Sequence, residues 1–521
     1  MYNVQQMIFS DPVKLNATRY SEKKAVTFKG KSFTYREFNN RINQLGHALQ
    51  DLGIKKGDKV AFMLFNCNQL MEAIFACSKI GAVFVPINSR FIEREIKHVL
   101  DDSNAIAFIF DVRFASEVAK VKTTMHTTKH LISLGEAKEL TPIEYENWIK
   151  TNPIAEPFPN EHLNEHDTIC FLYTGGTTGL PKGAVRSHRS LYLVALLFSI
   201  EFNINRQGKG LVAGPLYGAA ALSISLPNFF VGNTVHILEK FHPLEVLKAI
   251  EEEKTTTAFL APPMFEAIFA LPKDMQNQYD VSSMKTLVSV GAPLQKSTKE
   301  KILTYFKDAD LNEFYGASEH GGSTNLFPEY QRDKTSSVGL PMLGMEVKLL
   351  NDLGEEIIPG EVGEFFVKGL TLCDEYYRNP KATAHAFKGE WLGLGDMGKR
   401  DEEGFYYIVD RKQDMILSGA INVYPAEIES VLFEHPKVAE VAVIGIPHEK
   451  WGETPVALVV LRDGETANEK DILDFCQGKL AKYKIPHAVD FVTELPRSLQ
   501  GKVLKYQLRE KYANTFSKEN H

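Results

Sequence analysis

The sequence predicts an α/β protein built from more than one domain. Its 521 residues exceed what a single hydrophobic core usually holds, and its 44% hydrophobic and 24% charged residues are typical of a globular chain. In the first half, short apolar runs that read as buried strands alternate with segments of helical periodicity. Strands that alternate with helices favour a largely parallel sheet covered on both faces.

The individual elements follow from these patterns. In the first half, the expected strands are residues 59–65, 82–87 and 105–110, and the expected helices are residues 68–79 and 92–100. From residue 336, short β-like segments separated by turn signals predict a small, mostly antiparallel β subdomain. The last segments predict a compact α+β tail, with helices at 426–434 and 470–480 and strands at 438–444 and 489–492.

Composition and charge exclude several classes of function. The formal net charge is −7. Proteins that bind nucleic acids usually carry an excess of basic residues that neutralises the phosphates, so no nucleic-acid partner is expected. The five cysteines lie far apart with no CxxC pair, which suits a reducing compartment and offers no zinc site. The N-terminal residues lack a signal-peptide pattern, and the longest apolar stretch, Leu191–Phe202, is too short to span a bilayer. We therefore expect a cytoplasmic protein without integral membrane contact.

The strongest local motif is the segment 173–183, YTGGTTGLPKG, which follows an expected strand at 168–172. Its glycines free the backbone to turn several N–H groups toward one centre, threonine hydroxyls add donors, and a lysine adds positive charge. It is not a Walker A loop, because no Gly-Lys-Ser/Thr closes it. A solvated turn between strand and helix is the alternative, but the density of donors favours phosphate binding. The expected ligands are Thr174, Gly175, Gly176, Thr177, Thr178, Gly179 and Lys182.

A second glycine motif, Gly393–Gly398, fits the GxGxxG pattern of dinucleotide-binding turns. That fingerprint requires a helix directly after it. Here the following residues, KRDEEGFYYIVD, are charged, then turn-like, then strand-like. We therefore expect no Rossmann dinucleotide site.

Further motifs follow the phosphate loop along the chain. They are residues 291–294 (GAPL), 315–319 (YGASE), 337–339 (SVG), 360–364 (GEVGE), 391–396 (WLGLGD), 410–429 (from DR to NVYPAEIE) and 496–502 (from PR to GK). With the phosphate loop, this ordered set resembles the adenylate-forming superfamily, which includes acyl-CoA synthetases, adenylation domains of peptide synthetases and luciferases. The resemblance covers nearly the whole chain.

The resemblance implies a domain arrangement. A large N-terminal domain, residues 1–410, would hold two parallel-type α/β subdomains and a small β-barrel-like subdomain at 336–410. Residues 411–414 would form a hinge, and residues 415–521 a small mobile α+β domain. Gln413 would lie at the pivot, where many relatives have Lys or Asp.

The resemblance also implies the chemistry. A carboxylate attacks the α-phosphorus of ATP to give an acyl adenylate and pyrophosphate, and a thiol then displaces AMP. Two anions are forced together, so catalysis depends on neutralising and positioning them. Lys502 would reach between carboxylate and α-phosphate, Glu319 would ligate Mg²⁺, and Ser318 would contact the α-phosphate. The remaining ATP-binding residues implied are Gly291, Ala292, Pro293 and Tyr315 around the adenine, Gly316 beside Tyr315, and Asp396 with Arg411 at the ribose.

The acid is constrained by the stretch 217–222, YGAAAL. Peptide-synthetase domains need an aspartate after the aromatic residue here, and this stretch has no acidic residue. The ammonium of an amino acid would be buried without a partner, so amino acids are disfavoured. The small apolar residues favour a medium- or long-chain fatty acid, although helix packing alone would also explain them. The expected acyl pocket consists of Tyr217, Gly218, Ala219, Gly291 and Gly316.

Free CoA is the expected acceptor, since only about twenty residues follow Lys502, too few for a fused carrier domain. Its thiol arm would pass a tunnel wall formed by Gly419 and Ala420, where Ala420 replaces a frequent glycine. Gly175 likewise stands where relatives usually have Ser. The sequence leaves open an acyl-AMP ligase that loads a separate acyl-carrier protein, a luciferase-like oxygenase, a non-catalytic nucleotide-binding protein, and assembly as a homodimer.

Overall fold

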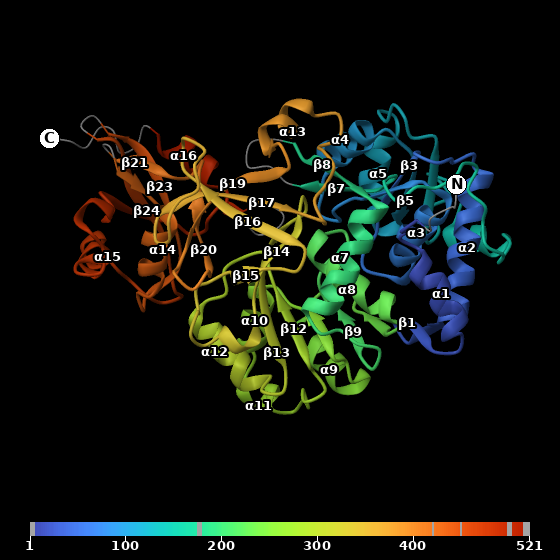
Figure 1. Ribbon diagram of the computed structural model, residues 1–521, viewed down its shortest axis with the longest axis horizontal. Coiled ribbons are helices and arrows are strands. Elements are labelled where there is room, and N and C mark those ends of the chain that lie inside the picture. Colours follow the sequence, from blue (N-terminus) through green and yellow to red (C-terminus); the bar gives the residue numbers. More distant parts are fainter. Residues whose placement is uncertain (1–5, 175–179, 419–420, 449–450, 498–502, 514–521) are drawn as a thin grey trace. The chain divides into compact units, whose positions relative to one another are not determined.

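A computed structural model describes residues 6–174, 180–418, 421–448, 451–497 and 503–513. These residues form two compact units, whose elements are labelled in Figure 1. The first unit contains the described residues up to 347, together with 367–392. The second contains residues 348–366 and the described residues from 393 onward. The second unit therefore includes part of the predicted β subdomain as well as the predicted α+β tail.

One sheet of the first unit is predominantly parallel. Its order is β6 (His130–Leu134), β5 (Ala105–Asp111), β3 (Lys59–Met63), β4 (Val83–Pro86), β7 (Thr168–Thr174) and β8 (Lys182–Ser187). All neighbouring pairs are parallel except β7–β8, which is antiparallel. The three strands predicted in the first half are thereby confirmed as β3, β4 and β5.

The other sheet of the first unit has nine strands. Its order is β15 (Leu340–Pro341), β14 (Gly321–Leu326), β13 (Asp310–Ala317), β12 (Thr286–Ser289), β11 (Thr257–Phe259), β9 (Lys209–Val212), β10 (Thr234–Ile237), β1 (Lys24–Phe28) and β2 (Lys31–Thr34). The strands from β13 to β1 are parallel, and the outer pairs are antiparallel. Segments that follow β9, β11, β12 and β13 therefore leave the same edge of the sheet, where ligands of open α/β sheets bind.

Helix α3 (Asn68–Ile80) is buried on nearly all sides. It contacts β4 and β7 of one sheet and β1 of the other. Its sequence is apolar around most of its circumference instead of along one stripe, which is typical of a helix inside a core. The other helices of the first unit are α1 (Asp11–Arg19), α2 (Tyr35–Asp51), α4 (Glu93–Ser103), α5 (Ala115–Lys122), α6 (Tyr145–Lys150), α7 (His188–Glu201), α8 (Ala219–Val231), α9 (Pro243–Glu253), α10 (Pro262–Phe269), α11 (Lys273–Gln276), α12 (Lys296–Tyr305) and α13 (Pro380–Ala386).

A third sheet has five strands: β16 (Met345–Leu350), β17 (Val362–Gly369), β19 (Trp391–Arg400) and β18 (Phe387–Lys388) in that order, with β20 (Tyr406–Arg411) also paired to β19. The β18–β19 and β19–β20 pairs are antiparallel, as predicted. The GxGxxG segment Gly393–Gly398 lies inside β19, and the next element is another strand. The rejection of a Rossmann turn is therefore confirmed.

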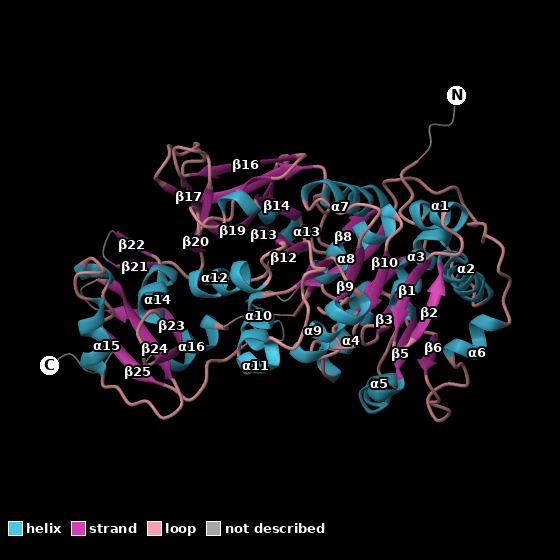
Figure 2. Ribbon diagram, turned by 90° about the horizontal axis from the view of Figure 1, so that it is seen from below, coloured by secondary structure: helices cyan, strands magenta, loops and turns pink. Residues whose placement is uncertain are grey.

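The tail is an α+β fold around a sheet with the order β22 (Ile421–Val423), β21 (Ile416–Ser418), β24 (Gly452–Leu461) and β23 (Val438–His448), with β25 (Ala488–Phe491) also paired to β24. Figure 2 shows these strands beside α14 (Pro425–Phe433), α15 (Glu469–Cys476) and α16 (Lys505–Tyr512). The helix predicted at 470–480 ends earlier, at Cys476, because Gln477 has extended backbone, and Gly478 after it has a φ of 75°. Helix α16 was not predicted. No helix in the described part of the chain has both the length and the apolar character to cross a membrane.

His188, the first residue of α7, is a buried histidine with an incomplete set of hydrogen bonds. Its Nδ1 accepts from the Phe9 N–H at 3.3 Å, while its Nε2 has no partner among the described residues. Burial lowers the pKa of His188 from 6.5 to about 4, against a smaller opposing effect of Asp167. The folded protein therefore holds this imidazole neutral where an unfolded chain would protonate it.

Replacing His188 with glutamine is expected to reduce the loss of unfolding free energy that occurs as the pH falls below 6.5. Because the folded pKa is lower than the unfolded one, the stability present at neutral pH is lost as pH falls from 6.5 toward about 4. The loss attributable to this group is about 3 kcal/mol. Urea unfolding at a series of pH values measures it. Equal acid slopes for the wild type and His188→Gln would show that His188 does not drive the loss.

Candidate active site

The predicted phosphate loop connects two antiparallel strands. Thr174 at the end of β7 and Lys182 at the start of β8 are register partners, so the described ends of the loop lie opposite each other. The segment is therefore not a turn between a strand and a helix, the alternative considered for it, since α7 begins only after β8. Several predicted site residues lie outside the described residues: Gly175, Gly176, Thr177, Thr178, Gly179, Gly419, Ala420 and Lys502.

Helix α4 supports both ends of this loop. The Tyr173 hydroxyl donates to Asp102 Oδ2 at 2.6 Å, and His98 Nε2 donates to the Pro181 carbonyl oxygen at 2.8 Å. Burial, together with the Asp102 carboxylate, raises the pKa of Tyr173, so the phenol stays protonated and remains a donor. A Cβ at Gly183 would come within 3.1 Å of the Tyr173 ring, so the glycine allows this packing.

Glu319 lies beside the loop ends in the first unit. Its side chain is buried, and its Oε1 accepts from the Tyr376 hydroxyl at 2.8 Å and from the Thr174 hydroxyl at 3.3 Å. Lys182 Nζ lies 5.7 Å from the centre of the Tyr376 ring. The structure thus brings together Thr174, Lys182 and Glu319, all predicted, with Tyr376, which sequence reasoning missed. Its only sequence signal was an aromatic pair, Tyr376-Tyr377, within a polar stretch.

The predicted adenine slot lies at the carboxyl edge of the nine-stranded sheet. Residues 291–293 follow β12 and are exposed, residues 315–317 end the neighbouring parallel strand β13, and Ser318 follows it. Gly316 must be glycine, because a Cβ there would clash with the carbonyl oxygen of Gly321. The Tyr315 ring centre lies 5.7 Å from that of His320. The segment 291–294 is bonded to β13, since the Leu294 N–H donates to Glu313 Oε1 at 3.2 Å.

The two residues predicted for the ribose meet in the second unit. Asp396 and Arg411 are register partners on β19 and β20, and Arg411 Nε lies 2.6 Å from Asp396 Oδ1. The preceding Asp410 binds the start of α14, because its Oδ2 accepts from the Ala426 N–H at 2.8 Å. Gln413 follows in the turn after β20. Arg411, the first residue of the predicted hinge, is therefore bonded to β19, and the residue before the hinge is bonded to α14.

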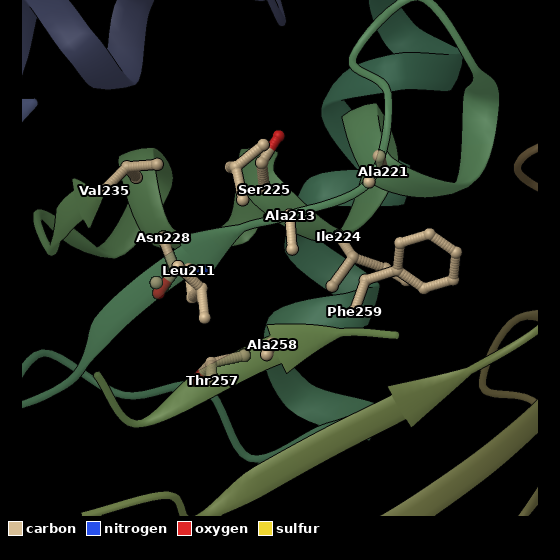
Figure 3. A pocket seen from close by; sticks show the side chains of 13 residues that line it. Leu211, Ala213, Ala221, Ile224, Ser225, Asn228, Val235, Thr257, Ala258 and Phe259 are labelled. Carbon is tan, nitrogen blue, oxygen red and sulfur yellow. The ribbon is translucent and has the colours of Figure 1, made fainter. Parts of the chain in front are cut away.

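The predicted acyl-pocket residues Tyr217, Gly218 and Ala219 lie where the chain passes from β9 into α8. Burial raises the pKa of Tyr217, with the charge of Arg90 opposing the shift, so the phenol is neutral. None of these three residues lines the cavity of about 10 Å³ that lies between α8 and the strands β9 and β11, where the α8 lining begins at Ala221. Its lining is mostly apolar, and Figure 3 shows Leu211, Ala213, Ile224 and Phe259 around it. This volume holds about one water molecule.

The donor set around Glu319 fits Mg²⁺. Among the described residues, no group of three His, Cys, Asp or Glu side chains gathers as a metal centre. Magnesium in nucleotide sites is commonly held by one or two carboxylates together with phosphate oxygens and waters. Glu319 supplies one such carboxylate: its Oε1 accepts two hydrogen bonds, and its Oε2 accepts none from the described residues.

Comparisons with known proteins agree along the whole chain. The AMP-binding enzyme family matches residues 13–377, and the AMP-binding enzyme C-terminal domain matches residues 427–502. A feruloyl-CoA synthase of Amycolatopsis sp is 34% identical over 94% of this chain and 96% of its own length. A long-chain-fatty-acid–CoA ligase of Bacillus subtilis is 32% identical, over 97% and 94% respectively.

Among solved structures, ATP-bound MatB from Rhodopseudomonas palustris superposes with a TM-score of 0.89 at 27% identity, covering 98% of this chain and all of its own. The match covers the two large sheets of the first unit, the third sheet and the α+β tail. Ligases of this family use ATP, Mg²⁺ and CoA. The chain therefore belongs to the AMP-binding enzyme family of adenylate-forming enzymes, and it is an AMP-forming acid–thiol ligase of the acid–CoA ligase type.

Proposed function

We propose that this ligase activates a medium- or long-chain fatty acid as acyl-AMP and then forms the acyl-CoA thioester, as part of fatty-acid metabolism. One observation carries the proposal: Tyr217, Gly218 and Ala219 bring no charged side chain to the edge of the sheet, and the cavity lined by the following residues of α8 is mostly apolar. An alkyl tail gains by leaving water for such a surface, whereas an ammonium would be left unpaired. The cavity is small, so a bound chain also requires rotamer changes at Ile224 or Phe259.

An aryl acid is the second candidate. The feruloyl-CoA synthase and the long-chain-fatty-acid ligase are similar to this chain to nearly the same degree. The ferulic ring is aromatic but carries a hydroxyl and a methoxy group, and ferulic acid is shorter than a long-chain fatty acid. The length of the pocket beyond Gly218 therefore distinguishes the two acids.

In the first half-reaction, a carboxylate oxygen bonds to the α-phosphorus of ATP and the bond to pyrophosphate breaks. Thr174, Lys182 and the intervening loop bind the β- and γ-phosphates. Lys182 is suited to this role, since its Nζ forms no ion pair within the described residues and its charge is not neutralised there. Ser318 binds the α-phosphate, and Lys502 reaches the oxygens that gain negative charge. Mg²⁺, when held by Glu319, supplies positive charge beside the phosphate oxygens.

The nucleoside occupies the edge formed by residues 291–293, Tyr315 and Gly316, and its ribose hydroxyls are bound by Asp396 and Arg411. In the second half-reaction, the sulfur of CoA bonds to the acyl carbon, AMP leaves and the thiol proton is released. We propose that residues 411–414, with Gln413 as pivot, let the domain 415–521 turn relative to the domain 1–410 between the two steps. The CoA arm then passes Gly419 and Ala420.

The test is AMP release from purified protein with ATP, Mg²⁺ and a panel of acids, each with and without CoA. The panel contains saturated fatty acids of graded length, ferulic acid and amino acids. AMP release that requires both CoA and a fatty acid supports the proposal. A preference for ferulic acid favours the second candidate. Pyrophosphate release with no effect of CoA points to a separate acyl-carrier protein as acceptor.

Replacing Gly218 with phenylalanine is expected to shorten the preferred acid. A Cβ at this position approaches only the Pro215 carbonyl oxygen, at 3.3 Å, so the ring can point toward the acid. We expect kcat/KM for the longest acids to fall by about 10- to 100-fold, while short acids lose less than about threefold. Gly218→Ala is the matched control and should retain the wild-type profile. A uniform loss across all chain lengths would place Gly218 outside the acyl pocket.

A further inference from the structure

Arg186 is a fully buried arginine in β8, four residues after Lys182. Its side chain has a relative exposure of 1%, and within the described residues it forms no ion pair. Arginines are rarely buried without a paired carboxylate, because removing the charge from water is costly. The burial therefore needs an explanation that the fold alone does not supply.

The guanidinium group binds the backbone that carries Ser318. Its Nη1 donates to the Ser318 carbonyl oxygen at 2.8 Å, its Nη2 donates to the Thr371 carbonyl oxygen at 2.8 Å, and its Nε donates to Ser190 Oγ at 3.2 Å. All three acceptors are neutral. The guanidinium is thus held by hydrogen bonds while its positive charge stays uncompensated by direct contact.

Two further hydrogen bonds fix the same turn. The Glu319 carbonyl oxygen accepts from the Cys373 N–H at 2.5 Å, and the His320 carbonyl oxygen accepts from the Thr371 hydroxyl at 2.8 Å. The carbonyls of three consecutive residues, 318 to 320, are therefore all anchored to Arg186 or to the segment 371–373. The backbone of the turn is thereby fixed, and the Glu319 side chain is held in addition by Tyr376 and Thr174.

We propose that Arg186 is a positioning residue for adenylation, which fixes the Ser318–Glu319 turn and places a buried positive charge behind it. The inference rests on the proposed roles of Ser318 and Glu319. ATP and the acid bring their negative charges together in the first half-reaction, and a fixed cation behind the turn offsets part of that charge without moving. After pyrophosphate leaves, less negative charge remains. Arg186 should therefore matter more for adenylation than for thioester formation.

Burial also acts on the arginine itself. It lowers the pKa of Arg186, and nearby acidic groups, including Asp374 and Glu319, oppose this shift. Because an arginine keeps its proton under any ordinary condition, the group remains a cation even here. A lysine at this position would be a compact charge with a different donor geometry, and a glutamine would keep donors without charge.

The experiment compares Arg186→Gln, Arg186→Lys and the surface control Arg189→Gln, whose side chain pairs with Glu165 at 2.9 Å. Two rates are measured on protein verified as folded: ATP–pyrophosphate exchange with the acid, and CoA transfer from a supplied acyl-adenylate. We expect Arg186→Gln to lower exchange by about 10- to 100-fold and transfer by less than about threefold. Arg186→Lys should recover part of the exchange, and calorimetric ATP binding should weaken in the same order.

Equal losses in both rates, unchanged exchange, or no recovery by lysine would overturn the proposal. Thr371→Val provides a second route if the arginine variants do not fold. It removes the bond to the His320 carbonyl and keeps the buried charge, and it should slow exchange but not transfer. If the wild type itself shows no ATP–pyrophosphate exchange with any acid, the proposed function is wrong and the inference falls with it. If the wild type shows exchange and only the Arg186 result differs from expectation, the inference alone is wrong.

Discussion

Replacing Lys502 with methionine is expected to remove most acyl-adenylate formation while leaving CoA transfer from a supplied acyl-adenylate nearly intact. Methionine retains much of the length of the side chain but has no positive charge to offset the charge gathering between carboxylate and α-phosphate. We expect ATP–pyrophosphate exchange to fall by about 100- to 1000-fold. Transfer should change by less than about threefold, because the proposed domain rotation would withdraw the lysine before the thiol enters.

The control for this variant is Lys511→Met, which removes an exposed lysine on α16. It should leave both rates unchanged. If Lys502→Met lowers exchange and transfer equally, the lysine acts on folding or nucleotide retention instead of on adenylation. If neither rate changes, a cation other than Lys502 offsets the negative charge between the carboxylate and the α-phosphate.

The local part of the fold was predictable from local patterns. The strands β3, β4 and β5 and the helices α3 and α4 arise where apolar periodicity, turn signals and burial all agree. The GxGxxG segment shows that a short motif must be interpreted together with its neighbours. Here it lies inside β19 and another strand follows, whereas a dinucleotide-binding turn is followed by a helix. Helix α16, by contrast, is short and mostly polar, with Leu508 and Tyr512 as its buried residues, so its periodicity gave little signal.

The candidate site was predictable only in part, because its contacts join distant segments. Thr174 and Glu319 bond across 145 positions, and Tyr376 reaches Glu319 across 57. Motif order identified Thr174 and Glu319, but nothing local marked Tyr376 as their neighbour. Arg186 was equally hidden, since a charged residue inside a strand reads as solvent-facing until tertiary packing buries it. Residues that position others are therefore found by structure, while motif residues are found by sequence.

Replacing Glu319 with glutamine is expected to lower ATP–pyrophosphate exchange by about 100- to 1000-fold. Glutamine keeps the shape of the side chain, and its carbonyl oxygen can still accept from Tyr376 and Thr174. It lacks the negative charge that a hard cation prefers, so the Mg²⁺ concentration for half-maximal exchange should rise by about tenfold. Exchange measured across a Mg²⁺ titration gives both quantities.

Tyr376→Phe tests the hydrogen bond to Glu319 separately from the charge of the Glu319 carboxylate. It removes the hydrogen bond of 2.8 Å to Glu319 Oε1 and leaves the charge in place, so we expect a loss of less than about tenfold in exchange. The Mg²⁺ requirement should stay close to wild type, because the carboxylate group is retained and still accepts from Thr174. If Tyr376→Phe is as damaging as Glu319→Gln, orientation outweighs charge, and Glu319 acts mainly by holding the loop ends together. If Glu319→Gln alone alters the Mg²⁺ dependence, the carboxylate is the metal ligand and Tyr376 fixes its direction.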